Sequence, residues 1–95
     1  MRELNEIRVD INKIDEEMRE LFIKRMQLAS EIAAYKIEHE LPITDPKREE
    51  EVIEKNLSTL KDPTLSGHYV DFIKATIEIS KNYQRALLFD SKADV

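Results

Sequence analysis

The residues of this sequence best suited to chemistry are polar side chains set among apolar helix positions. Arg25 stands where a three-and-four spacing of apolar residues predicts an apolar side chain, and Lys36 follows eleven residues later. On a helix eleven residues amount to a rotation of only about 20°, so both cations lie on one face. The small residues Ala29 and Ala33 lie between them and leave room for a ligand. Because a buried guanidinium without a partner is costly, Arg25 needs either an acidic mate or an anionic ligand; Lys36 could also be a solvated lysine at a helix end.

A second pair of polar residues interrupts the apolar stripe near the C-terminus. The stripe runs through Ile73 and Ile77 and then reaches Ser80 and Gln84, which are one helical turn apart and face the same way. Both can donate hydrogen bonds to an anion or an ether oxygen. The alternative is a polar pair in the core that satisfies itself.

A third group lies in the middle of the chain. Asp45 and Pro46 indicate a helix N-terminus, with an N-cap followed by proline at the first helical position. Arg48 and Glu49 then extend the apolar face of this helix toward an end that offers free N–H groups and a positive dipole. An ordinary charged first turn is the alternative reading of these two residues.

Three helices must position these groups. The first is expected from Leu4 to about His39, the second from Asp45-Pro46 to Leu60, and the third from about His68 to Leu88. The apolar positions of the first are Leu4, Ile7, Ile11, Ile14, Met18, Leu21, Leu28, Ile32 and Tyr35. We therefore predict an all-α fold, with residues 1–90 as one domain and residues 91–95 as a polar tail.

The predicted first helix is too long to be covered by the rest of a chain of this size. At about 1.5 Å per residue it exceeds 50 Å, and the remaining residues of its own chain cannot cover it. Arg8 lies seventeen residues before Arg25, which is roughly 25 Å along the axis and about 100° around it. Two antiparallel copies of the helix could bring both arginines to one ligand, so we predict an intertwined homodimer.

Composition excludes several classes of function. The net charge of −5 leaves no basic face for nucleic acids, and the absence of Cys excludes disulfide and thiolate chemistry. His39 and His68 form no metal-type pair, so we expect no metal site. The sequence contains no apolar run of membrane-spanning length and no signal-peptide pattern, so we expect a soluble, cytoplasmic protein.

The ordered set of these residues resembles the all-helical chorismate mutases over about residues 4 to 88. The motifs that carry the resemblance are Arg8 in Glu-Ile-Arg-Val-Asp-Ile, Ile14-Asp15, Arg25 in Lys-Arg-Met-Gln-Leu-Ala, Lys36 in Ala-Tyr-Lys, Asp45 to Glu49 as Asp-Pro-Lys-Arg-Glu, and Ile79-Ser80 with Gln84. Lys81 beside Ser80 is an unusual residue in this pattern.

The resemblance implies an intertwined dimer that rearranges chorismate to prephenate on the route to phenylalanine and tyrosine, without a cofactor. By resemblance, Lys36 and Gln84 donate to the ether oxygen, and Glu49 accepts from the ring hydroxyl. The arginines bind the two carboxylates, with Arg25 also counted among the catalytic residues and Arg8 entering the partner's site. Ser80 assists one carboxylate, and backbone N–H groups near Asp45 reach the hydroxyl.

Two alternatives remain open at this point. An isochorismate-pyruvate lyase has the same fold and a similar set of cations, but such enzymes tend to lack the acidic residue that follows the arginine of the second helix. Glu49 therefore favours the mutase. The other alternative is a helical dimer without catalysis that acts as a regulatory partner of another shikimate-pathway enzyme.

Overall fold

The computed structural model describes residues 1–93, and within them all regular structure is helical. The elements are α1 (Leu4–Glu38), α2 (Pro46–Ser58), a single 3₁₀ turn η1 (Pro63–Leu65) and α3 (Ser66–Ala93). Three helices with a long first one confirm the predicted fold class.

Helix α1 ends in a left-handed turn that uses no glycine. Glu40 has φ 55°. The N–H of Leu41 donates to the carbonyl of Lys36 at 2.8 Å, and the N–H of Glu40 donates to that of Ile37 at 3.3 Å. These two bonds satisfy the last carbonyls of the helix in the Schellman pattern. A side chain in this conformation costs about 1–2 kcal/mol, which the capping bonds must offset.

Helix α2 begins as predicted and ends earlier. The Asp45 side chain accepts from the N–H of Arg48 at 3.2 Å, and Pro46 is the first helical residue. The predicted end at Leu60 is wrong by two residues. The hydroxyls of Ser58 and Thr59 donate to the carbonyls of Lys55 and Asn56, and such local bonds compete with continuation of a helix.

Helix α3 is longer than predicted at both ends. Asp62 Oδ1 accepts from the N–H and the hydroxyl of Thr64, and these hydrogen bonds, the side-chain one first, lower the pKa of Asp62. The turn that they stabilise runs directly into α3 at Ser66, two residues before the predicted start at His68.

The C-terminal end of α3 also lies beyond its predicted position. The helix continues past Leu88 to Ala93, because its polar last turn contains neither proline nor glycine to stop it. The polar tail that we expected over residues 91–95 is thus helical as far as Ala93, and its last two positions, 94 and 95, lie outside the described residues.

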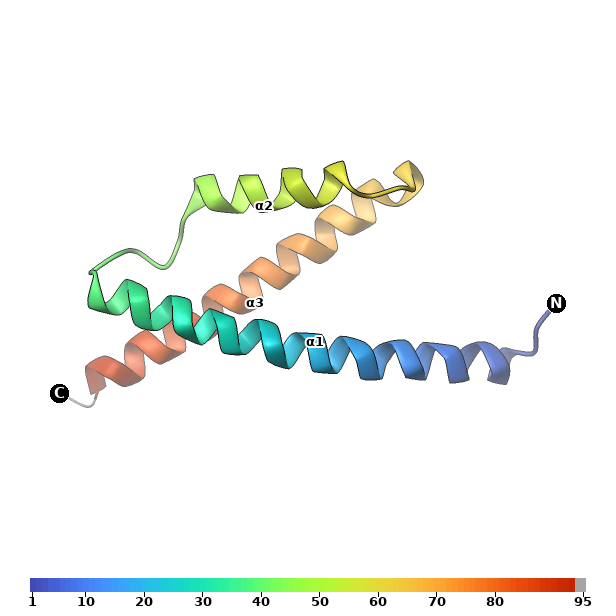
Figure 1. Cartoon of the computed structure of the whole chain (residues 1–95), viewed down its shortest axis with the longest axis horizontal. Coiled ribbons are helices and arrows are strands. Elements are labelled where there is room, and N and C mark those ends of the chain that lie inside the picture. The colour runs from blue at the N-terminus through green and yellow to red at the C-terminus, as the bar shows by residue number, and fades with distance from the viewer. Residues whose placement is uncertain (94–95) are drawn as a thin grey trace.

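Helix α3 packs against both other helices (Figure 1). The buried apolar residues are Ala29 and Ala33 of α1 and Ile73 and Ile77 of α3. Ala33 is only 1% exposed. Two alanines at the crossing let the backbones of α1 and α3 approach closely, which larger residues would prevent. This close crossing places Ser80 and Gln84 of α3 opposite α1.

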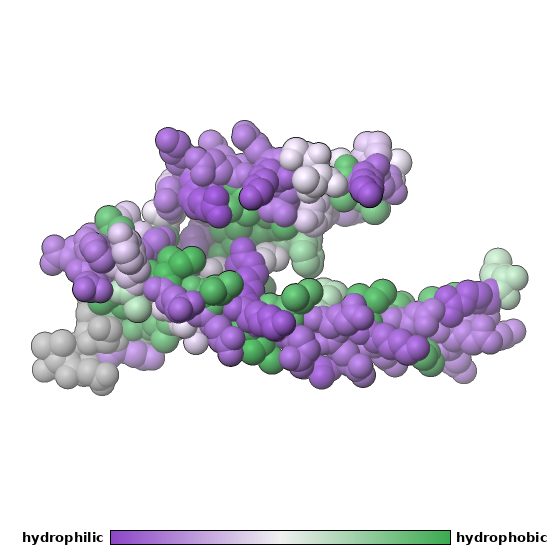
Figure 2. All heavy atoms as spheres, in the orientation of Figure 1, coloured by the Kyte–Doolittle hydropathy of each residue, from purple (hydrophilic) through white to green (hydrophobic). Residues whose placement is uncertain are grey.

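The N-terminal part of α1 has no covering element. Every side chain from Met1 to Arg25 is exposed, and Figure 2 shows apolar side chains along this helix. The radius of gyration is 17.1 Å, against about 13 Å for a compact domain of about this length. A single chain therefore leaves its own heptad seam bare. No helix among residues 1–93 is long and apolar enough to cross a membrane.

Candidate active site

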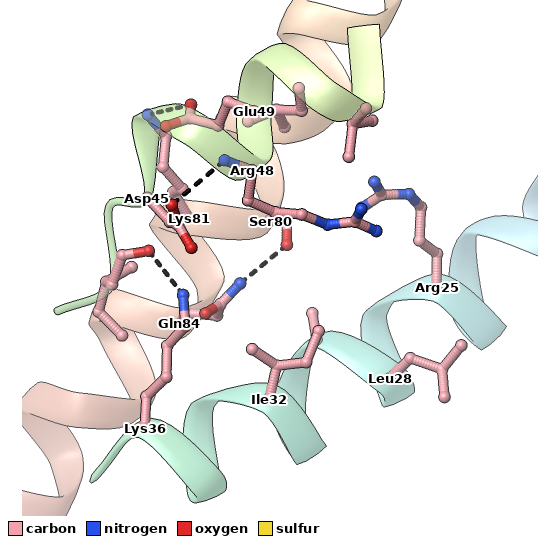
Figure 3. A pocket seen from close by; sticks show the side chains of 14 residues that line it. Arg25, Leu28, Ile32, Lys36, Asp45, Arg48, Glu49, Ser80, Lys81 and Gln84 are labelled. Carbon is pink, nitrogen blue, oxygen red and sulfur yellow. Dashed lines mark hydrogen bonds and ion pairs between the residues drawn. The ribbon is translucent and has the colours of Figure 1, made fainter. Parts of the chain in front are cut away.

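One cavity of about 500 Å³ lies among the three helices and the loop that leads into α2 (Figure 3). Its volume falls in the range of small-molecule sites, about 300–1,000 Å³. Its lining is Arg25, Leu28, Ala29, Ile32, Lys36, Ile43, Asp45, Arg48, Glu49, Val52, Ile77, Ser80, Lys81 and Gln84. Four cations against two carboxylates make the cavity positive, although the whole chain carries −5.

Two arginines extend into this cavity from opposite helices. In Figure 3 the guanidinium groups of Arg25 and Arg48 point toward each other from α1 and α2. Arg48 makes an exposed contact of 3.8 Å with Glu51, which is worth little. Arg25 forms no ion pair within residues 1–93. Facing guanidinium groups repel unless an anion lies between them, so the arrangement favours an anionic ligand over an acidic mate.

Lys36 is held at the loop end of the cavity. Its Nζ donates to the carbonyl oxygen of Ile43 at 2.9 Å, and the side chain is half-buried. The alternative of a freely solvated lysine is therefore wrong. An ammonium group has three donors, so one hydrogen bond to the loop fixes Lys36 and leaves two donors for a ligand.

Ser80 and Gln84 are buried, at 9% and 5% exposure. Gln84 Nε2 donates to Ser80 Oγ at 3.0 Å. The other amide atom of Gln84, Oε1, is buried and has no partner in the described part of the chain. Turning the amide over would let Ser80 donate to the oxygen and would instead leave the NH₂ group without a partner. An unmade bond of this kind costs about 1–3 kcal/mol, so the pair does not satisfy itself and a ligand could complete it.

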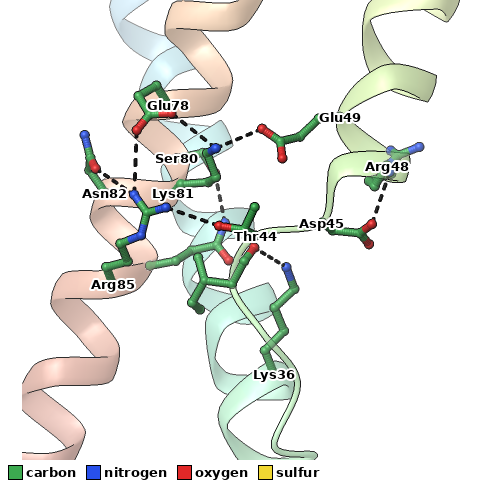
Figure 4. A network of polar contacts seen from close by, with 12 residues as sticks. Lys36, Thr44, Asp45, Arg48, Glu49, Glu78, Ser80, Lys81, Asn82 and Arg85 are labelled. Atoms are coloured by element: carbon green, nitrogen blue, oxygen red, sulfur yellow. Dashed lines mark hydrogen bonds and ion pairs between the residues drawn. The ribbon is translucent and has the colours of Figure 1, made fainter.

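Glu49 reaches the cavity with its charge balanced from α3. Lys81 Nζ lies 2.9 Å from Glu49 Oε1 and 3.2 Å from Glu78 Oε2 (Figure 4). The hydrogen bond to Glu49, followed by the one to Glu78, raises the pKa of Lys81. Glu49 is thus more than the ordinary charged first turn that we considered, because it joins α2 to α3 at the cavity.

A second contact ties the loop before α2 to the same helix. Arg85 donates to the Thr44 hydroxyl at 3.2 Å and lies 3.6 Å from Glu78. The neighbouring loop residues are Ile43, which accepts from Lys36, and Asp45, which caps α2. Arg85 therefore holds the loop that orients two walls of the cavity.

Seven of the eight site residues predicted from the sequence line this one cavity. The eighth, Arg8, is exposed on the uncovered part of α1 and does not line the cavity of its own chain. Sequence reasoning missed the backbone carbonyl of Ile43, which has no sequence signature, and the role of Lys81. The only signal for Lys81 was its unusual place beside Ser80.

The comparisons with known proteins agree on one family. The family model described as chorismate mutase type II matches residues 7–85. A bifunctional chorismate mutase/prephenate dehydratase of Aquifex aeolicus is 35% identical over 93% of this chain and 26% of its own length. The T-protein of Haemophilus influenzae is 41% identical over 52% of this chain and 13% of its own length. The chain thus spans about a quarter or less of these relatives. No solved structure matches significantly.

Proposed function

Because the chain belongs to the type II chorismate mutase family, we propose that it rearranges chorismate to prephenate in phenylalanine and tyrosine biosynthesis. The observation that carries the proposal is the positive cavity in which facing arginines, a tethered lysine and a buried glutamine meet. Chorismate is a dicarboxylate with an ether oxygen and a ring hydroxyl, and each of these groups has a counterpart among the lining residues.

The arginines supply recognition. Arg25 and Arg48 bind carboxylates, for which a planar guanidinium is well shaped. With both carboxylates held, the enolpyruvyl side chain lies folded over the ring in a conformation close to the transition state. Ser80 assists one carboxylate. Val52 and Ile77 lie among the apolar walls that flank the ring.

Lys36 and Gln84 supply the electrostatic part of catalysis. As the ether C–O bond breaks and the new C–C bond forms, negative charge gathers on the ether oxygen, and no atom or proton is gained or lost. Lys36 keeps one donor on Ile43 and offers another to this oxygen. Gln84 donates one hydrogen of its NH₂ group to Ser80 Oγ, which fixes the amide, and offers the other hydrogen to the ether oxygen. Preorganised donors of this kind are worth about 10²–10³ in rate each.

Glu49 recognises the ring hydroxyl. One oxygen of its carboxylate accepts from this hydroxyl. Asp45 acts mainly as the cap of α2, and backbone N–H groups near it reach the same hydroxyl.

The active form in this proposal is an intertwined homodimer. All side chains up to Arg25 are exposed, and an antiparallel second copy would cover the apolar seam of α1. Such a copy would also bring its Arg8 toward the cavity, as the third arginine of the site. Sedimentation should give twice the 11.2 kDa mass of the chain. A cytoplasmic location remains a prediction.

The direct test is incubation of the purified protein with chorismate, with its loss and the appearance of prephenate followed together. Because the pericyclic rearrangement requires no metal and no nucleophile, we expect activity to survive exhaustive chelation. Unchanged chorismate would refute the proposal, and a requirement for added metal would refute the mechanism. Pyruvate release from isochorismate, without action on chorismate, would favour the lyase alternative.

A further inference from the structure

Lys81 is the one cation of the cavity to which the proposed mechanism gives no task of its own. It comes from α3, next to Ser80, and its side chain is only 16% exposed. Its two partners differ: Glu49 on α2 is 25% exposed, whereas Glu78 on its own helix is 56% exposed. The pair with Glu49 is the shorter and the better shielded, so it is the stronger of the two.

The pair with Glu49 solves an electrostatic problem of the site. A carboxylate that faces a doubly negative ligand would repel it. The Lys81 ammonium offsets this charge from the side, and the two carboxylates that contact it raise its pKa. The other charged groups close to this pair are Arg48, beside Glu49 on α2, Lys74, which lines a small cavity with Glu49 and Glu78, and Arg85, which contacts Glu78 at 3.6 Å.

The same contact fixes the direction of the carboxylate. Lys81 lies on Oε1 of Glu49 at 2.9 Å, and within residues 1–93 no donor contacts Oε2. One oxygen is therefore anchored to α3 while the other is left to accept a hydrogen bond.

We propose that Lys81 is a positioning residue for substrate recognition, which anchors and neutralises Glu49 so that its second oxygen can accept from the substrate's ring hydroxyl. This inference rests on the proposed function. It adds a role for a side chain to which the family resemblance assigns none, and it makes the α2–α3 ion pair part of the active site.

A double-mutant cycle tests the proposal in the full chain. We expect Lys81→Met to lower kcat/KM for chorismate about tenfold, within the range of coupling between contacting residues. The loss should appear mainly in KM, because the hydroxyl is bound alike in ground and transition states. In a Glu49→Gln background the same substitution should change kcat/KM less than about twofold, since its partner is already lost. Lys81→Arg should restore most of the activity.

Glu78→Gln is the matched control, because it removes the other ion pair of Lys81 and leaves the pair with Glu49 intact. We expect kcat/KM within about twofold of the parent. Equal losses from Lys81→Met in both backgrounds, or a loss in Glu78→Gln as large as that in Lys81→Met, would overturn the proposal.

A measurement without substrate tests the contact itself. In an NMR titration of the lysine side chains, Glu49→Gln should bring the pKa of Lys81 down toward its ordinary value, since Glu49 is the main cause of its rise. An unchanged pKa would overturn the inference whether or not the enzyme is active. A parent protein that leaves chorismate unchanged refutes the proposed function, and with it this role of Lys81. If the parent is active but the losses from Lys81→Met and Glu49→Gln simply add, only the proposed role of Lys81 is refuted.

Discussion

Replacing Gln84 by Glu would convert a permanent hydrogen-bond donor into one that depends on pH. The glutamine is 5% exposed and bonded to Ser80 at 3.0 Å, and glutamate has nearly the same shape. A carboxyl group donates to the ether oxygen only when it is protonated. The parent should therefore keep its activity across mildly acidic and neutral pH, whereas Gln84→Glu should be active in acid and lose activity as the pH rises.

The magnitude follows from titration. The ordinary pKa of glutamic acid is about 4.3, and burial beside an anionic substrate favours the protonated form. Above the apparent pKa of the variant, each pH unit lowers the protonated fraction tenfold. The fall in kcat/KM should level off about 10²–10³ below the parent, which is the contribution of one donor, because only Lys36 then acts on the ether oxygen.

The assay is kcat/KM for chorismate against pH for both proteins, with circular dichroism to show that both stay folded. Gln27→Glu is the matched control, because it places the same charge on an exposed position of α1. Its profile should follow that of the parent. If Gln84→Glu also follows the parent, Gln84 does not donate to the developing charge.

Three further outcomes are expected. Arg8→Ala and Arg25→Ala should each be nearly inactive. After co-refolding in equal amounts, half of the dimers are heterodimers with one intact site of two, so the mixture should regain about a quarter of parental activity. No recovery in verified heterodimers would exclude a shared site. Ala33→Leu should destabilise the protein by about 1–3 kcal/mol in chemical denaturation by overfilling the α1–α3 crossing, and Ala34→Leu, at an exposed position, should not. Glu40→Gly should raise Tm, since it relieves about 1 kcal/mol of left-handed strain at φ 55°, and a lower Tm would argue against that turn.

Local signals in the sequence account for most of the fold. The heptad spacing predicts α1, and Asp45 with Pro46 predicts the start of α2, because both are short-range patterns with a direct physical cause. The ends of α2 and α3 were harder to predict from the sequence. The end of α2 depends on hydroxyl groups that donate to carbonyls three residues earlier. The start of α3 depends on the 3₁₀ turn at Pro63, which leads directly into the helix. Gly67, read as a loop signal, fits within the first turn of α3 without a positive φ.

The candidate site was predictable where polar residues broke an apolar stripe. Arg25, Ser80 and Gln84 stood out for this reason, and they line one cavity. The anchoring of Lys36 by Ile43 and of Glu49 by Lys81 could not be predicted, because both contacts depend on how a loop and two helices meet in space. Arg8 remains a prediction, since a single chain holds it away from the cavity.

The bare N-terminal half of α1 ties catalysis to mass action. In the proposed dimer a protomer that separates exposes its seam and loses an arginine from its site, so folding, assembly and activity share one equilibrium. Each tenfold dilution then removes about 1.4 kcal/mol from the stability of the assembled state. When the concentration of the chain is near the dissociation constant of the dimer, a cell that halves its synthesis would lose more than half of the activity. A partner that binds the same seam tightly would inactivate the enzyme without contacting the cavity.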